Sequence, residues 1–585
     1  MKQTKTSTLN KVMQYAQPYK NKMFWVVLTV ITLSIFGALR PYMVKNVVDV
    51  YIAKNDLNGL NIYIALMTAV LILEVTSQFF FTYIASWLGQ NIIKDIRTNL
   101  FKKMLNFKLS YFDNEPVGKL ITRNVSDIEN IASIFSQGLF MIVGDVLKML
   151  VVLGIMLWMN WKLTLIVVVA MPVLVYATRI FQKHMKVAFE EVRLQVANLN
   201  TFVQERLTGM KIVQLFNREH IEYDNFKKIN QKHNDAWQKN ILYNSIFFPI
   251  ADIVSSVTLG CVIIYGGFSI VQGDHLTTTG DLFGYTMMIS MLFNPLRQIA
   301  DKFNVMQMGI VAADRVFEIL DRDDLIQTQG NQIAPAFKGA IQFKNVNFSY
   351  SNGKRVINNL SLNIKPGQTV AFVGASGAGK STIANLLSRF YDIESGEILI
   401  DENNVNHFTL SSLRNQIAVV LQDVFLFSDS ILNNIILDNP NISKEDVIAA
   451  AKKIGINDFI EKLPGGYDYN VKERGVMLSS GQRQLIAFLR AYMSNPSILI
   501  LDEATSSIDT YSEELLQNAV NIITKNRTSI IIAHRLATIV NADLIVVMDQ
   551  GNIVETGTHN QLLAKENGAY KNLYESQFAS TSSVN

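Results

Sequence analysis

The residues with the clearest chemistry form a glycine-rich stretch, Gly374-Ala375-Ser376-Gly377-Ala378-Gly379-Lys380-Ser381. It has the spacing G-x-x-x-x-G-K-S, between an apolar run at 369–373 and a helix-like run that begins at Thr382. In this strand–turn–helix context, backbone N–H groups surround phosphate oxygens, Lys380 reaches the β- and γ-phosphates, and Ser381 holds Mg²⁺. The stretch therefore predicts a nucleoside triphosphate site. A glycine-rich turn without a ligand is the alternative.

A second stretch that could take part in chemistry contains two carboxylates. The apolar run Ile498–Leu501 ends in Asp502 and Glu503. At the end of a buried strand, Asp502 would join the Mg²⁺ shell, and Glu503 would orient and deprotonate the attacking water. The alternative is that the pair only caps a helix.

Two weaker signals accompany these stretches. Ser479-Ser480-Gly481-Gln482 precedes a helix-like run, and small residues at a helix start suit an anion. Tyr350 precedes the glycine-rich stretch and would stack on adenine. A lone aromatic residue is more often part of a core, so these two signals depend on the wider pattern.

The composition of the chain limits the class of protein to which these residues can belong. The chain has 585 residues and 17% charged residues, against about 25% in soluble domains, and the deficit lies in its first half. A net charge of +4 is too small to argue for nucleic acid. The single cysteine, Cys261, excludes structural disulfides and a cysteine-based metal site, and we expect it to be a small buried thiol.

The first half contains apolar segments that each reach the ~20 residues a helix needs to cross a bilayer. Residues 1–22 before them resemble an amphipathic helix on the membrane surface, with a disordered tail as the alternative. They do not resemble a cleavable signal peptide. The six segments are 23–44, 61–88, 131–159, 162–182, 241–272 and 281–310.

The loops between these segments give their orientation. The long connections after the second and fourth segments are rich in lysine and arginine, whereas 272–281 has none. By the positive-inside rule, the N-terminus, both long connections and the nucleotide-binding half are cytoplasmic. Apolar spacing of three and four residues predicts helices that extend into the cytoplasm, with turns near 111–118 and 207–211.

Four charges lie inside the predicted membrane segments: Glu74, Asp145, Lys148 and Asp252. Ionisable groups at this depth are costly, so they face a partner or a cavity. Their pattern leaves a polar substrate pathway and structural ion pairs equally open.

The motifs together resemble those of an ATP-binding cassette (ABC) exporter half-transporter of the bacterial multidrug and lipid type, over essentially the whole chain. Gln422 matches the family's Q-loop, Ser506–Asp509 its D-loop and His534 its switch histidine. Tyr350 matches the adenine-stacking residue, 478–482 the signature, and Glu473–Gly475 the cross-contact loop. Two residues depart from the pattern: Ser480 and Lys472 stand where the family usually has glycine.

The resemblance implies a multidomain fold. An all-α, six-helix transmembrane domain with long cytoplasmic extensions would precede an α/β P-loop nucleotide-binding domain. The expected boundaries are 1–22 for an elbow helix, 23–320 for the transmembrane domain, 321–339 for a linker and 340–585 for the cassette.

The resemblance also implies a function: ATP-driven export or flipping of hydrophobic or amphipathic molecules, such as drugs, lipids or lipid-linked compounds, by alternating access. The half-transporter would act in the bacterial inner membrane as a homodimer or heterodimer, with ATP and Mg²⁺ and without nucleic acid. An ATP-gated channel or regulator of the same fold is the alternative. The implied catalytic residues are Glu503, His534 and Gln422, and the implied Mg²⁺ ligands are Ser381, Gln422 and Asp502. The implied nucleotide-binding residues are Tyr350, the loop 374–381 and Thr382, with Asp509 in the D-loop. The residues implied to act on the partner's nucleotide are Ser479, Ser480, Gly481 and Gln482.

Overall fold

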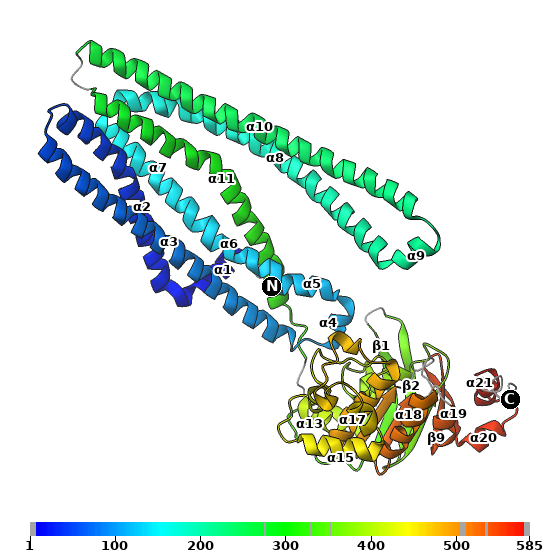
Figure 1. Ribbon diagram of the computed structural model, residues 1–585. Helices are drawn as coiled ribbons and strands as arrows, with labels where there is room; N and C mark the ends of the chain where they lie inside the picture. The colour runs from blue at the N-terminus through cyan, green and yellow to red at the C-terminus, as the bar shows by residue number, and fades with distance from the viewer. Residues whose placement is uncertain are drawn as a thin grey trace. The chain divides into compact units, whose positions relative to one another are not determined.

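The computed structural model describes residues 8–273, 277–326, 330–350, 353–502, 510–532 and 536–577 (Figure 1). The chain forms two compact units. The helical unit comprises Met1–Leu105 and Pro116–Asp323, and the sheet unit comprises Asn106–Glu115 and Asp324–Asn585. Residues 106–115 therefore belong to the sheet unit, although both of their neighbours in sequence belong to the helical unit.

Long helices make up the helical unit (Figure 1). One helix runs without a break over 117–159 and contains two π-helical stretches, at 123–127 and 134–139. The α-helices are α1 (Thr8–Ala16), α2 (Lys20–Asn46), α3 (Leu57–Met104), α5 (Val117–Thr122), α6 (Ile128–Ser133), α7 (Phe140–Met159), α8 (Trp161–Thr208), α9 (Met210–Leu215), α10 (Glu219–Val271) and α11 (Thr279–Leu320).

Among the described residues, five helices are long and apolar enough to cross a membrane: 8–52, 57–104, 117–159, 161–208 and 219–271. All six predicted segments lie in helices, but α11, which holds 281–310, is not among the five. Its apolar run is interrupted by Asn294, Pro295 and Arg297. The prediction of six crossings is thus not confirmed by length and hydropathy.

The helix pair α8 and α10 is much longer than a bilayer is thick. The 53 residues of α10 correspond to about 80 Å, against ~30 Å of hydrocarbon. Figure 1 shows the two helices side by side, and the rings of Phe181 and Phe247 stack between them with centroids 4.0 Å apart. Both helices therefore continue far beyond the apolar layer.

The first helix, α1, packs against α11. Its residues Val12 and Ala16 are buried, and Tyr15 lies against Phe317 of α11 with ring centroids 5.9 Å apart.

The expectation that Cys261 is buried is wrong, because its side chain is exposed on α10. A lipid-facing helix surface is as apolar as a core, so an apolar sequence run does not distinguish the two.

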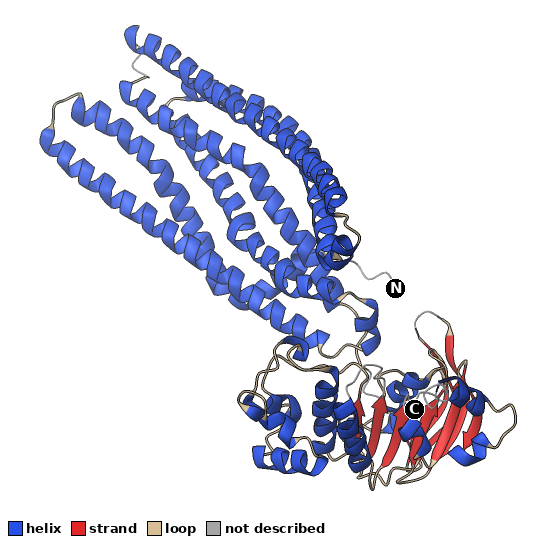
Figure 2. Cartoon of the chain, turned by 45° about the vertical axis from the view of Figure 1, so that its right-hand side comes forward, coloured by secondary structure: helices blue, strands red, loops and turns tan. Residues whose placement is uncertain are grey.

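The sheet unit contains two sheets with helices beside them (Figure 2). Its strands are β1 (Ile341–Ser349), β2 (Arg355–Ile364), β3 (Thr369–Val373), β4 (Ser395–Ile400), β5 (Asn403–Asn404), β6 (Ile417–Val420), β7 (Ile498–Asp502), β8 (Thr528–Ile532), β9 (Leu544–Asp549) and β10 (Asn552–Gly557). Its α-helices are α4 (Leu109–Asn114), α12 (Lys380–Leu387), α13 (Leu410–Asn415), α14 (Ile431–Ile436), α15 (Lys444–Ile454), α16 (Asn457–Glu461), α17 (Ser480–Met493), α18 (Thr510–Ile523), α19 (Leu536–Val540), α20 (His559–Leu563) and α21 (Ala569–Gln577).

The larger sheet has the strand order β10-β9-β3-β8-β7-β6, and all its pairings except β10 with β9 are parallel. Successive residues of β3 enter different cores: Val370 and Phe372 join one, and Ala371 and Val373 join the other. Both faces of this sheet are therefore covered, as expected for a parallel sheet of continuous apolar strands. The smaller sheet, β2-β1-β4-β5, is antiparallel.

The segment 106–115 is joined to the sheet unit by backbone hydrogen bonds. Ile326 N–H donates to the Asn106 carbonyl at 2.8 Å, and Lys108 N–H donates to the Asp324 carbonyl at 3.0 Å. Side chains of the segment also contact this unit: the Lys108 ammonium lies 3.3 Å from Asp392, and the Tyr391 hydroxyl donates to Asp113. Both main-chain and side-chain contacts thus hold α4 in this unit.

Candidate nucleotide site

The glycine-rich loop connects β3 to α12, as the sequence pattern predicts. Gly374 has φ +151°, and a Cβ there would lie 2.2 Å from the Met548 carbonyl oxygen. Gly379 has φ +102°, and its Cβ would meet Ile357 and Val356 at 2.9 and 3.0 Å. These two glycines are required because their backbone conformation and their neighbours leave no room for a side chain.

Between these glycines the loop is open to ligands. Ala375, Ser376 and Gly377 are exposed, while the Ala378 side chain is buried and its carbonyl accepts the Gly551 N–H at 3.2 Å. The loop is thus anchored on the sheet side and presents its tip outward.

Lys380, the first residue of α12, is folded back over the loop. Its ammonium donates to the carbonyls of Gly374 and Ala375 at 2.8 and 2.9 Å, and its side chain is buried. Burial lowers the pKa of Lys380 below its usual value, and the negative charge of Asp502 partly offsets that shift. A phosphate in the loop would replace these carbonyls as the partner of the ammonium.

The carboxyl ends of the parallel strands meet at one edge of the sheet, and this edge gathers the candidate residues. The glycine-rich loop follows β3, Asp502 ends β7 as a buried residue, and the exposed Gln422 follows β6. Ligands bind at this edge in open parallel sheets. Glu503 and Asp509 follow β7, and His534 follows β8; all three lie outside the described residues.

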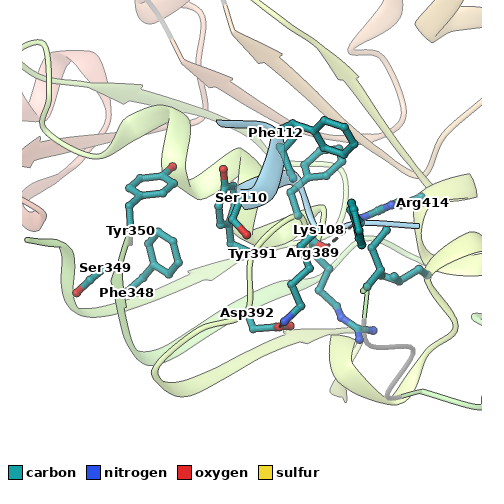
Figure 3. Close-up of a pocket in the computed structure, with 15 residues that line it drawn as sticks. Lys108, Ser110, Phe112, Phe348, Ser349, Tyr350, Arg389, Tyr391, Asp392 and Arg414 are labelled. Carbon is teal, nitrogen blue, oxygen red and sulfur yellow. Dashed lines mark hydrogen bonds and ion pairs between the residues drawn. The ribbon is translucent and has the colours of Figure 1, made fainter. Parts of the chain in front are cut away.

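Tyr350 lies just after β1 and contacts the start of α12. Its hydroxyl is 3.2 Å from the hydroxyl of Thr382 and accepts a hydrogen bond from Asn385 at 3.3 Å. Its ring meets the ring of Tyr391 edge-on, with centroids 5.0 Å apart (Figure 3). The structure therefore brings Tyr350 next to the helix that carries Lys380 and Ser381.

A cavity of about 400 Å³ opens beside Tyr350 (Figure 3). Its wall includes Tyr391, Arg389 and Arg414, together with Lys108 and Phe112 of the 106–115 segment. Burial and the neighbouring Asp113 carboxylate raise the pKa of Tyr391, so its hydroxyl stays protonated and donates to Asp113. Tyr391 could not be selected from local sequence patterns, because its partner Asp113 lies 278 residues away.

The stretch 479–482 forms the start of α17. Ser479 is the N-cap: its hydroxyl accepts the Gln482 N–H at 3.2 Å, and Gln482 accepts the Ser479 N–H at 3.0 Å. Ser479 and Ser480 are exposed, whereas Gly481 is buried. In the described part of the chain, no hydrogen bond joins this stretch to the glycine-rich loop.

Lys472 adopts an unusual backbone conformation. Its φ of +60° and ψ of −173° lie in a region that is essentially restricted to glycine. Lys472 stands where the family usually has glycine, and its backbone conformation is one that favours glycine. Arg474, two residues on, has φ +54°.

Comparison with known proteins bears directly on the identity of the chain. Residues 23–296 match the ABC transporter transmembrane region, and residues 357–506 match the ABC transporter domain. The putative multidrug export ATP-binding/permease protein YgaD of Bacillus subtilis (strain 168) is 36% identical over 97% of this chain and 99% of its own length. The chain belongs to the ABC transporter family.

Two further similarities narrow the type of transporter. The ATP-dependent lipid A-core flippase of Haemophilus influenzae (strain 86-028NP) is 37% identical over 93% of each protein. A bacterial Atm1-family ABC exporter, solved with ATP bound, has a TM-score of 0.76 and 28% identity over 96% of this chain and 98% of its own. The chain is thus an ABC exporter half-transporter that binds and hydrolyses ATP to drive export, with several membrane helices and a cytoplasmic ATPase domain.

Proposed function

We propose that this half-transporter exports or flips hydrophobic and amphipathic molecules, such as drugs, lipids or lipid-linked compounds, across the bacterial inner membrane. Support comes from two relatives, one named as a putative multidrug exporter and the other as a lipid A-core flippase. ATP binding would close the cassettes, and hydrolysis would reset the membrane helices, so that the substrate site opens alternately to either side. Residues 1–22, 23–320, 321–339 and 340–585 would form the elbow, membrane domain, linker and cassette.

Two chains would share each ATP site. The observation that carries this proposal is the exposed start of α17, where Ser479 and Ser480 present the N-terminus of a helix. Two helix N-termini neutralise a triphosphate better than one. The glycine-rich loop of one chain would therefore face Ser479–Gln482 of the other.

Oxygen ligands suited to Mg²⁺ gather at the same edge of the sheet. The described residues include no group of three His, Cys, Asp or Glu side chains placed to hold a metal. Ser381, Gln422 and Asp502 would instead supply oxygens, and phosphate and water would complete the shell, as is usual for Mg²⁺. The bound ion would neutralise charge on the phosphates.

Glu503 would act as the general base, with His534 contacting the γ-phosphate, Gln422 contacting the metal and water, Asp509 meeting the partner chain and Tyr350 stacking on adenine. We expect Glu503→Gln to reduce ATP turnover by at least about 100-fold, because the attacking water loses its base. The variant should still retain ATP through gel filtration as a closed dimer. The matched substitution Glu513→Gln, on α18, should leave both readouts unchanged; normal turnover in Glu503→Gln would refute the assigned role.

The experiment that tests the function as a whole uses the purified chain alone. Reconstituted in inside-out vesicles, it should hydrolyse ATP, respond to a panel of lipids and drugs, and accumulate a transported compound against its gradient. Uphill accumulation separates an exporter from an ATP-gated channel, which only dissipates a gradient. A lack of both ATPase activity and uphill transport would contradict the proposal for the chain acting alone.

A further inference from the structure

The cavity beside Tyr350 is lined by an arginine without a carboxylate partner. The Arg414 guanidinium donates to the carbonyls of Ser388 and Arg389 at 3.2 and 3.0 Å. Among the residues that the structure describes, Arg414 is in no ion pair. A guanidinium carries more N–H groups than these two hydrogen bonds use, so Arg414 has donors left for a ligand.

The charges around this cavity are mostly positive. Its lining holds three cations and one carboxylate: Lys108, Arg389, Arg414 and Asp392. The carboxylate lies 3.3 Å from the Lys108 ammonium, and the nearby Asp113 accepts the hydroxyl of Tyr391. Even with Asp113 counted, positive charge is in excess by one.

Burial adds to the effect of this excess charge. It lowers the pKa of Arg389 and of Arg414, and the positive charge of Arg389 lowers the pKa of Arg414 further. A cation whose charged form is disfavoured in this way is stabilised by an added negative charge. The cavity therefore favours an anionic ligand.

The rest of the wall is largely aromatic. Six rings line the cavity: Phe107, Phe112, Phe348, Tyr350, Phe390 and Tyr391. The Arg414 guanidinium lies over the Phe390 ring, 4.7 Å from its centroid. Aromatic rings and guanidinium planes both pack well against a further planar ring. The volume of about 400 Å³ is within the roughly 300–1,000 Å³ of small-molecule sites.

The fold holds the cationic groups in place. Arg389 is buried, and its Nη1 donates to the carbonyls of Val405 and Phe408 at 3.2 and 3.0 Å. Arg414 is held by its two carbonyl acceptors and by Phe390. A ligand would thus meet groups whose conformational entropy is already lost, which lowers the cost of binding.

We propose that this cavity binds a small aromatic carboxylate, whose oxygens pair with the Arg414 guanidinium and whose ring packs against the aromatic wall. The planar N–H groups of a guanidinium match the two oxygens of a carboxylate. Every lining residue belongs to the sheet unit, so the ligand would be distinct from a molecule transported through the membrane helices. The site does not depend on which compound the protein exports.

Binding is tested on the full chain in phosphatidylcholine nanodiscs, with empty nanodiscs as the blank for partition into lipid. 2-Naphthoate is the probe, and 2-naphthamide is its uncharged match. Titration calorimetry should give an affinity at least about tenfold higher for the carboxylate, because only the carboxylate forms a charged pair with arginine. Equal affinities for the two compounds would overturn the proposal.

Substitutions locate the bound probe. Arg414→Gln should lower the affinity for 2-naphthoate to that for 2-naphthamide and leave 2-naphthamide binding unchanged. Lys108→Gln is a second test that leaves the carbonyl contacts of Arg414 in place, and it should also weaken 2-naphthoate binding. The matched control is Lys444→Gln, because Lys444 likewise pairs with an aspartate, Asp468, at 2.7 Å. This control should bind 2-naphthoate like the wild type.

Two further results would overturn the proposal by placing the probe elsewhere. Unchanged 2-naphthoate binding in both Arg414→Gln and Lys108→Gln would place it outside the cavity, for example at a transport site. An apparent Kd that rises without limit as ATP is added, in the absence of Mg²⁺, would make the cavity part of the nucleotide site. Binding that persists at saturating ATP and depends on Arg414 and Lys108 would confirm a separate site, whether or not the protein exports the probe.

Discussion

At the scale of single residues, Lys380 and Lys472 each adopt an unfavourable arrangement. Lys380 is a buried cation whose ammonium donates to two carbonyls of its own loop. Lys472 has a backbone conformation that suits glycine. Each residue leads to a measurable consequence, one for ligand affinity and the other for stability.

ATP affinity should fall as pH rises in the alkaline range. Burial lowers the pKa of Lys380 in the free protein, and a bound triphosphate would raise it again. Binding then takes up a proton between the two pKa values, so affinity is constant below the lower one and declines above it. Titration with a fluorescent ATP analogue from about pH 8 to pH 10.5 measures this. Lys380→Arg should show a flatter profile; identical profiles would exclude Lys380 as the titrating group.

Replacing Lys472 by glycine should stabilise the cassette. A non-glycine residue in this backbone region costs about 1–3 kcal/mol, and glycine would relieve that cost. Thermal unfolding of the purified chain should therefore shift upward in Lys472→Gly. Lys472→Ala removes the same charge but keeps the Cβ, so it should unfold like the wild type; equal stabilisation by both variants would attribute the effect to charge.

At the scale of elements, Tyr391 links α4 to the end of β1. Tyr350 touches Tyr391, and the Tyr391 hydroxyl donates to Asp113 of α4. The chain on either side of 106–115 continues directly into the membrane helices α3 and α5. In the proposed scheme, adenine stacked on Tyr350 would act on Tyr391 and, through Asp113, on the chain segment that joins α3 to α5.

Breaking the Tyr391–Asp113 hydrogen bond should impair coupling more than ATP binding. Tyr391→Phe keeps the ring contact with Tyr350 but loses the hydroxyl, so we expect normal ATP affinity and a several-fold loss of substrate-stimulated ATPase activity. Asp113→Leu should have the same effect, whereas Asp113→Asn, which keeps an acceptor oxygen, should be mild. Additive losses in Tyr391→Phe/Asp113→Leu would show that the two residues act independently.

Local patterns predicted the elements better than they predicted the contacts. The loop at 374–381 could be placed between a strand and a helix because its glycines, its lysine and its flanking apolar run all lie within a short stretch. Tyr391 could not be identified, because its role depends on a residue near the start of the chain. Cys261 was assigned to a core because sequence hydropathy treats lipid and protein interior alike. Because Asn294 and Arg297 interrupt the apolar run of α11, this helix is not among the five in the described part of the chain that are long and apolar enough to cross a membrane.

At the scale of the whole molecule, each ATP site is proposed to need two chains. A chain with Lys380→Ala should therefore lack activity, and so should one with Ser480→Arg. A heterodimer of the two variants would keep one intact site, made from the loop of the second chain and the α17 start of the first. Tandem purification with two different tags, followed by measurement of retained ATP, tests this.

The matched control carries both substitutions on one chain, paired with an unchanged chain. If sites are shared, each site then contains one altered element, and ATP retention should be lost. Retention in this control together with loss in the first heterodimer would mean that each chain forms its site alone.

Because residues 106–115 belong to the compact sheet unit, a single cut in the gene does not separate the whole of that unit from the helical unit. A fragment that starts near residue 324 would lack Phe107 and Tyr111, which are both buried in the intact chain, and would leave Tyr391 without its acceptor. Such a fragment should be prone to aggregate at the uncovered surface. A synthetic decapeptide with the sequence of 106–115, supplied separately, is the natural means of restoring its solubility.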